Sequence, residues 1–167
     1  EGCDHRCAFC TIPAIRGRFI SKPAKIILAE AEELVESGAA ELNLIAQDTS
    51  YYGKDLKIKD GLASLIKKLE KLDRLKWLRL LYLYPVGITD TLLETIAASE
   101  KTLPYFDLPL QHISDNLLKN MRRPDTKKTI YKLIEKIRII LPDAALRTTF
   151  IVGLPGDTES AVAETEA

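Results

Sequence analysis

The sequence has only three cysteines, no long apolar run and no excess of charge of either sign. No 18 consecutive apolar residues occur and no signal peptide opens the chain, so we expect no membrane-spanning helix and no membrane partner. Lysine plus arginine number 24, as do aspartate plus glutamate, which excludes a strong overall attraction to nucleic acid. No internal repeat or low-complexity linker divides the 167 residues, so we expect one domain over residues 1–167.

All three cysteines lie within the first ten residues. Cys3, Cys7 and Cys10 have the spacing Cys-x3-Cys-x2-Cys, and three thiolates so close together can hold one inorganic centre on a loop. A structural zinc site or a ferredoxin-type cluster would need a fourth ligand, so three leave one metal position open for chemistry or for substrate. Clustered thiols without a pairing partner also indicate a reducing, cytoplasmic location.

Three other interpretations of these cysteines stay open. His5 could complete a zinc site, although one residue separates it from Cys7, which is cramped for tetrahedral closure. His112 could supply a remote fourth ligand. The cysteines could also be unrelated reduced thiols, since free cysteine is a common core residue, but their polar neighbours make a poor core.

Charge is unevenly distributed along the chain. Residues 1–25 contain five basic and two acidic side chains, a net charge of +3. Such a segment favours thiolates and attracts anionic ligands. The alternative is that these side chains belong to a solvated loop.

Apolar periodicity predicts strands that alternate with helices. The expected strands are residues 41–48, 77–84, 105–112 and 146–152. The expected helices cover 25–37, 62–69, 90–97 with Thr89 or Asp90 as cap, 117–121 and 130–137, and a last one starts near 157, whereas 12–18 reads as a loop. This alternation is typical of βα units and predicts an α/β fold with parallel strands.

Polar residues or a glycine turn mark the carboxyl ends of three of the expected strands, and parallel barrels build their ligand sites at those ends. The residues concerned are Gln47, Asp48, Gln111, His112 and the turn Gly153 to Gly156. Alternate side chains of a strand lie on the same face, so Gln111 should share a face with Asp107 and Pro109. We expect this face to point Gln111 into the barrel mouth.

Arg147 shares the inner face of its strand with Thr149 and Ile151, so we expect it to meet an anion such as a carboxylate. A purely structural pairing of Arg147 with Asp107 is the alternative. Other site candidates have plainer interpretations too: Asp48 as a turn residue, His112 as a surface or cap residue, Tyr82 and Tyr84 as packing residues, and Gly153 as part of a turn.

The cysteine spacing, with Phe9 before the last cysteine, resembles the signature of the radical S-adenosylmethionine (SAM) enzymes. Further segments resemble the methylthiotransferases of that superfamily: residues 1–4, 12–13, 16–18 and 153–158. Within that family, four segments are similar to the ribosomal-protein aspartate methylthiotransferases: residues 46–49, 81–85, 108–112 and 147–149. The tRNA-modifying relatives, which remain an alternative, typically read Gly-Gln-Asn and Gln-Ser-Gly after the first and third strands. Leu154 and Asp157 replace a more usual Phe and Glu.

The resemblance implies a fold and a set of cofactors. It implies a partial parallel (βα) barrel of the radical SAM type, truncated at both ends, in a piece of a longer protein. Cys3, Cys7 and Cys10 would hold three irons of a [4Fe–4S] cluster whose fourth iron binds SAM. The SAM contacts would come from Phe9, Gln47, Asp48, Gln111, Arg147, Ile151 and Gly153.

The resemblance also implies a reaction. The cluster would cleave SAM to a 5′-deoxyadenosyl radical, and a methylthio group would be added to the β-carbon of an aspartate in a small-subunit ribosomal protein. A reductant such as flavodoxin or ferredoxin would supply electrons. A second [4Fe–4S] cluster in a preceding domain and a following TRAM domain are expected outside this chain. A plain iron–sulfur electron carrier and a zinc-binding module are the non-catalytic alternatives.

Overall fold

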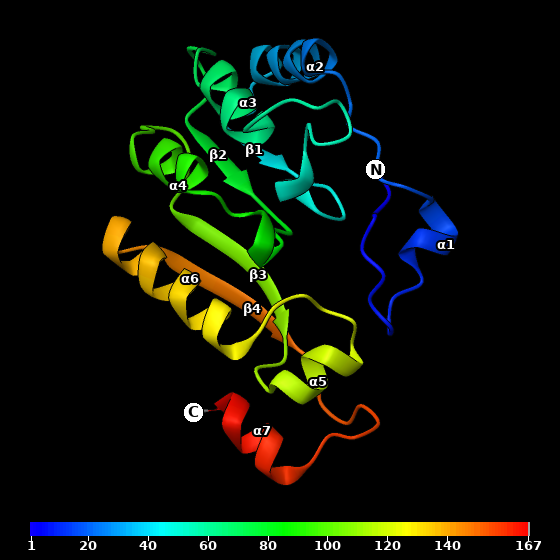
Figure 1. Ribbon diagram of the computed structural model, residues 1–167. Coiled ribbons are helices and arrows are strands. Elements are labelled where there is room, and N and C mark those ends of the chain that lie inside the picture. The colour runs from blue at the N-terminus through cyan, green and yellow to red at the C-terminus, as the bar shows by residue number, and fades with distance from the viewer. Residues whose placement is uncertain (167) are drawn as a thin grey trace.

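Helices and strands alternate along the chain, as the sequence predicts (Figure 1). The computed structural model describes residues 1–166. The strands are β1 (Glu41–Leu44), β2 (Trp77–Leu80), β3 (Tyr105–Gln111) and β4 (Ala145–Phe150). The α-helices are α1 (Ile12–Arg16), α2 (Ala24–Glu36), α3 (Gly61–Leu69), α4 (Asp90–Ala97), α5 (Asp115–Asn120), α6 (Lys127–Ile140) and α7 (Glu159–Glu166). Two short 3₁₀ helices are η1 (Thr49–Tyr51) and η2 (Pro85–Gly87).

The strands form two parallel pairs, β1 with β2 and β3 with β4. A parallel bridge between Leu78 and Thr102 joins the two pairs, and the backbone N–H of Leu83 donates to the carbonyl of Asp107 at 2.9 Å. The order β1-β2-β3-β4 brings all four carboxyl ends to one edge, which confirms the expected α/β fold with parallel strands. Within the described residues β4 pairs with β3 alone, and its residues from Arg147 to Phe150 are exposed.

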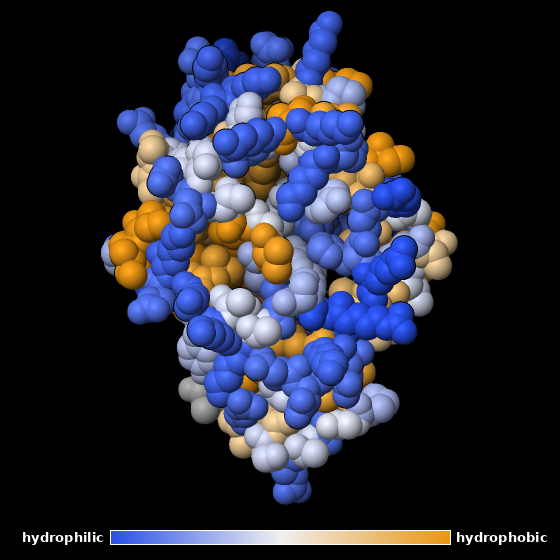
Figure 2. Space-filling view, viewed as in Figure 1, coloured by the Kyte–Doolittle hydropathy of each residue, from blue (hydrophilic) through white to orange (hydrophobic). Residues whose placement is uncertain are grey.

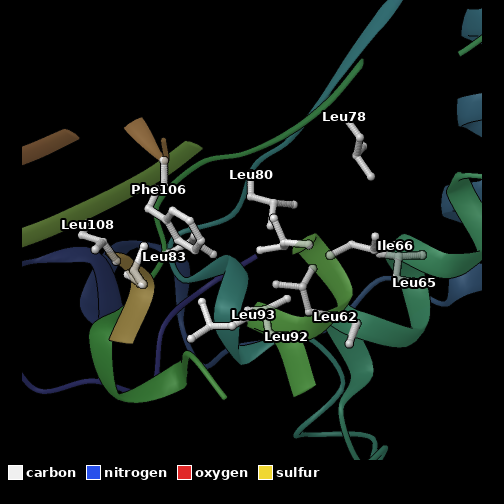
Figure 3. Close-up of a cluster of buried hydrophobic side chains, with 14 of the residues drawn as sticks. Leu62, Leu65, Ile66, Leu78, Leu80, Leu83, Leu92, Leu93, Phe106 and Leu108 are labelled. Atoms are coloured by element: carbon white, nitrogen blue, oxygen red, sulfur yellow. The ribbon is translucent and has the colours of Figure 1, made fainter. Parts of the chain in front are cut away.

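Helices α3, α4 and α6 run along one side of the strands, and the N-terminal segment lies on the other side (Figure 1). The apolar faces of these three helices pack against the strands in one continuous core (Figure 3). Ile66 of α3, Leu93 of α4 and Leu80 of β2 are fully buried there. On the face shown in Figure 2 the surface is mainly hydrophilic, with apolar groups in separate patches. No helix among residues 1–166 is long and apolar enough to cross a bilayer.

The helix limits follow local signals in the sequence. Thr89 is the N-cap of α4, where its side chain accepts a hydrogen bond from the N–H of Leu92 at 3.2 Å. Thr126 and Thr129 form a reciprocal capping box at the start of α6. Gly38 follows α2 with a φ of 104°, a left-handed conformation that glycine adopts without strain.

Two expectations from the sequence are wrong. Residues 12–16 form the short helix α1 rather than a loop, because Pro13 sits in its first turn, where a missing N–H is tolerated. The strands β1 and β2 also end four residues earlier than expected. After these strands end, side-chain oxygens accept backbone N–H groups in place of a neighbouring strand. Asp107 accepts the N–H of Tyr82 at 3.1 Å, and Thr49 accepts the N–H of Ala46 at 3.1 Å.

Replacing Leu93 by alanine should lower the free energy of unfolding by about 2–5 kcal/mol, because the truncation leaves a cavity in the core. Leu34→Ala on α2 is the matched control, since Leu34 is 53% exposed, and its effect should stay within about 0.5 kcal/mol. Urea unfolding followed by circular dichroism measures both values. Equal losses in the two variants would contradict the placement of the core.

Candidate functional site

The backbone of the cysteine loop is hydrogen-bonded to three separate parts of the chain. These hydrogen bonds hold the loop across the carboxyl ends of the strands. The N–H of Gly2 donates to Gln47 Oε1 at 2.7 Å, just beyond β1. The N–H of Cys3 donates to the carbonyl of Gly17 at 3.2 Å, and that of Ala8 to the carbonyl of Met121 at 2.9 Å, beyond α5. The loop therefore spans from the end of β1 to the end of α5.

Gly2 allows the close approach that starts this loop. Its φ is 82°, and a Cβ at this position would lie 2.1 Å from the carbonyl oxygen of Arg18. A larger residue would have to push the chain away from Arg18. Backbone packing thus requires glycine directly before the first cysteine.

His5 attaches the cysteine loop to residues that follow β1 and β2. Its Nε2 lies 2.8 Å from Asp48 Oδ2, and its ring stacks on Tyr84 with the centroids 3.8 Å apart. Asp48 is 3% exposed, and its other oxygen accepts a hydrogen bond from the Ser50 hydroxyl. His5 therefore fixes the cysteine loop to Asp48. Both oxygens of the Asp48 carboxylate already have partners within the chain.

The three thiols are free and partly exposed. Burial raises the pKa of both Cys3 and Cys7 above the ordinary value of a thiol. Within residues 1–166 no three His, Cys, Asp or Glu side chains are gathered closely enough to hold one metal ion. As they lie, the cysteines are therefore not arranged as a closed mononuclear zinc site.

Two buried donors next to Cys7 fit an anionic metal–thiolate. Tyr84 Oη and Arg123 Nη2 are buried and lack a hydrogen-bond partner. Burial raises the pKa of Cys7, whereas the Arg123 charge and the Tyr84 hydroxyl both act to lower it, so these groups favour the thiolate. Unpaired buried donors cost stability unless an acceptor arrives, and a metal-bound thiolate supplies one.

The ends of β3 and β4 hold a second group of the predicted residues. Gln111 has a φ of 73°, and the strand is irregular between Leu108 and Gln111, so simple alternation does not extend to Gln111 as we expected. The carbonyl of Gln111 accepts the N–H of Ile151 at 2.8 Å. The N–H of Gly153, with φ 81°, donates to Asp157 Oδ2 at 2.9 Å.

The side chain of Arg147, on β4, reaches across to the neighbouring strand β3. Its Nη1 is 3.4 Å from Asp107 Oδ1, which is the structural pairing considered above, while its side chain is 56% exposed. Asp107 itself is 3% exposed and also holds the N–H of Tyr82. Arg147, the third residue of β4, therefore keeps part of its guanidinium accessible.

His112 is completely buried, so the expectation of a surface residue is wrong, whereas that of a cap residue is consistent with its contacts. Its Nδ1 accepts the N–H of Ser114, the N-cap of α5, at 3.0 Å. Its Nε2 lies 3.6 Å from Asp157 Oδ1. Both ring nitrogens thus have neighbours that are not the cysteines.

Phe9 is 37% exposed and borders a hollow of about 400 Å³. The opposite wall consists of Leu117 and Met121, near the end of α5, and of Leu154 and Pro155 in the glycine turn. The hollow joins the cysteine loop to the turn that follows β4. It is apolar enough to take a flat ring.

The structure places the predicted residues in two adjoining groups, one at the cysteine loop with Gln47 and Asp48, and one at the ends of β3 and β4. Sequence reasoning missed the role of Tyr84, which we interpreted as a packing residue, and did not single out Arg123 or Asp125. The run Arg123-Pro124-Asp125 after a helix was the available signal, since a charged pair that flanks proline indicates a fixed turn.

Comparison with known proteins agrees with the fold and with the cysteine motif. The family model of the radical SAM superfamily matches residues 1–167. Ribosomal protein uS12 methylthiotransferase RimO of Citrifermentans bemidjiense is 52% identical over 158 residues, and that of Aquifex aeolicus is 50% identical over 159. These alignments cover 95% of this chain but 35% and 37% of the relatives, so the chain spans about a third of their length.

Solved structures show the same fold at low sequence identity. TsrM from Kitasatospora setae, a radical SAM methyltransferase solved with cobalamin and a [4Fe–4S] cluster, has a TM-score of 0.72 at 19% identity. The match covers 99% of this chain and 30% of TsrM. SuiB from Streptococcus suis, solved with SAM, has a TM-score of 0.63 at 18% identity over 98% of this chain and 34% of SuiB.

Replacing Asp48 by asparagine should lower the free energy of unfolding by about 1.5–3 kcal/mol, because it weakens the charge-assisted bonds to His5 and Ser50. Asp73→Asn is the control, since Asp73 is exposed in the turn before β2. Urea unfolding of the metal-free protein measures both. A loss of stability as small as that of the control would show that Asp48 does not hold the loop.

Proposed function

This chain belongs to the radical SAM superfamily, and from that premise we propose that Cys3, Cys7 and Cys10 hold a [4Fe–4S] cluster with one iron open to SAM. When bound and reduced, the cluster supplies the electron that cleaves SAM to a 5′-deoxyadenosyl radical. The observation that carries the proposal is the three-thiol loop, fixed over the strand ends with two unpaired donors beside Cys7. Sulfur ligands in this number suit iron better than a closed zinc site.

We assign the SAM contacts to the residues around the hollow and the strand ends. Phe9 would border the adenine, and the turn at Gly153 would let its flat ring approach the backbone. Gln111 and Ile151 would contact the ligand from the ends of β3 and β4. Gln47 and Asp48, whose side chains are occupied by Gly2 and His5, would act by fixing the loop that binds it.

Arg147 is our candidate partner for the carboxylate of SAM. Its side chain is 56% exposed and keeps donors free while Nη1 remains near Asp107. A guanidinium binds a planar carboxylate through two parallel hydrogen bonds, which lysine cannot reproduce. The nearby Asp107 carboxylate would hold the fork in place.

The names of the relatives extend the proposal to the whole protein. We propose that it adds a methylthio group to an aspartate of ribosomal protein uS12, in the cytoplasm, with electrons from a flavodoxin or ferredoxin. Because this chain spans about a third of those relatives, a second cluster and the substrate-binding part would lie in the rest of the protein. These residues would supply the radical, and the other parts the sulfur and the substrate.

Anaerobic reconstitution of this chain with iron and sulfide should give about four irons, with a spectrum that SAM changes. Cys7→Ser should lose the cluster, because a hard oxygen ligand replaces a soft thiolate. The intact protein, given SAM, reductant and uS12, should release 5′-deoxyadenosine and add a methylthio group, and Cys7→Ser should do neither. Iron analysis, absorption spectra and mass spectrometry of uS12 give the readouts.

Three results would contradict this function in different ways. One equivalent of zinc without iron uptake would indicate a zinc module. A cluster that SAM does not perturb would indicate an electron carrier. SAM cleavage by the intact protein, with modification of tRNA in place of uS12, would move the activity to the tRNA-modifying branch.

Arg147→Ala should weaken SAM binding by about ten- to a hundredfold, the effect of one lost charge-assisted hydrogen bond. The measurement is equilibrium binding of SAM to the anaerobically reconstituted protein. Arg74→Ala is the control, because Arg74 is exposed in the turn before β2, away from the strand ends, and should bind SAM as the parent does. Unchanged affinity in Arg147→Ala would leave Arg147 only its pairing with Asp107.

A further inference from the structure

Tyr84 occupies an unusual position beneath the cysteine loop. It is 7% exposed, its ring stacks on His5, and the guanidinium carbon of Arg123 lies 4.2 Å from its ring centroid. Its backbone N–H donates to the Ser50 hydroxyl at 3.1 Å. The ring is thus fixed by two neighbours and the backbone by a third, while the hydroxyl group has no hydrogen-bond partner.

Arg123 is held just as firmly. It is 7% exposed, and its Nε donates to Asp125 Oδ2 at 3.2 Å. Its Nη2 lies 3.1 Å from the same oxygen but without the alignment of a hydrogen bond, so this buried donor also stays unsatisfied. Asp125 is 4% exposed and neutralises the cation.

The two donors lie beside the segment that carries Cys7: Tyr84 stacks on His5, two residues before Cys7, and Arg123 comes two residues after Met121, whose carbonyl accepts the N–H of Ala8 at 2.9 Å. A tyrosine hydroxyl carries its proton at neutral pH and is therefore able to donate a hydrogen bond. In a native structure a pair of buried, unpartnered donors beside one segment needs an explanation.

We propose that Tyr84 Oη and Arg123 Nη2 donate hydrogen bonds to Cys7 Sγ when this thiolate binds the cluster, and thereby raise the reduction potential of that cluster. The inference rests on the proposed function, because it needs the cluster at Cys7. Donors to a ligand sulfur withdraw negative charge from the cluster and so stabilise its reduced, more negative state. Tyr84 and Arg123 are positioning residues in this scheme, since they act through Cys7.

A purely structural role for the Tyr84 hydroxyl predicts a different pattern. The hydroxyl has no partner in the metal-free chain, so removing it should leave stability unchanged or higher, because a buried unsatisfied group is lost. In the cluster-bound protein the same hydroxyl would have a partner, and its removal should be unfavourable. The sign of the effect therefore depends on the cluster.

The test compares Tyr84→Phe with the parent in the intact protein. In the metal-free state, urea unfolding should show stability equal to or above that of the parent. After anaerobic reconstitution, iron content should match the parent, and a redox titration followed by electron paramagnetic resonance, without SAM, should give a more negative midpoint potential. Arg123→Lys keeps the charge that Asp125 needs but loses the Nη2 donor, and its potential should shift in the same direction.

Matched controls lie beside both residues. Tyr82→Phe removes a hydroxyl from a side chain that is 48% exposed, and Arg122→Lys alters an exposed neighbour of Arg123, so both potentials should equal that of the parent. An unchanged potential in Tyr84→Phe at full iron content would overturn the inference. So would a Tyr84→Phe protein that is destabilised without metal, since the hydroxyl would then be structural. A parent that binds no iron would instead refute the proposed function.

Discussion

The attachment of the cysteine loop to the end of β1 is the constraint on which the site depends. Two contacts make it: the N–H of Gly2 donates to Gln47, and His5 meets the buried Asp48. A loop of ten residues without regular structure has many conformations, and fixing it is opposed by conformational entropy. These two hydrogen bonds, the second of them to a buried carboxylate, offset that loss and place the three thiols over the strand ends, where parallel α/β folds build their sites.

The polar residues that pack against the cysteine loop fall into two sets, one hydrogen-bonded within the chain and one with donors that lack a partner. His5, Asp48 and Ser50 satisfy one another and rigidify the loop in the metal-free chain. Tyr84 and Arg123, in contrast, carry donors that remain unpaired beside Cys7. In our proposal, the first set stabilises the conformation that would receive a cluster, and the second is complementary to the anionic thiolate that would form there.

Much of the fold could be predicted from the sequence, because periodicity and capping are local properties. The order of strands and helices, the Thr89 cap and the turn at Gly38 all follow from residues within a few positions of each other. The length of β2 could not be predicted, because the strand ends where the side chains of Asp107 and Thr49, 25 and 32 positions away, take over the backbone hydrogen bonds of Tyr82 and Leu81.

The cysteine spacing and its polar surroundings were determined by the sequence itself, since three ligands on one loop need no folding to be recognised. Which groups face those ligands was decided only by the tertiary structure. Tyr84 and Arg123 lie 77 and 116 positions beyond Cys7, and their meeting depends on where β2 and α5 end. In our proposal burial strengthens this interaction, because in a medium of low dielectric an unpaired donor and a metal-bound thiolate interact more strongly than in water.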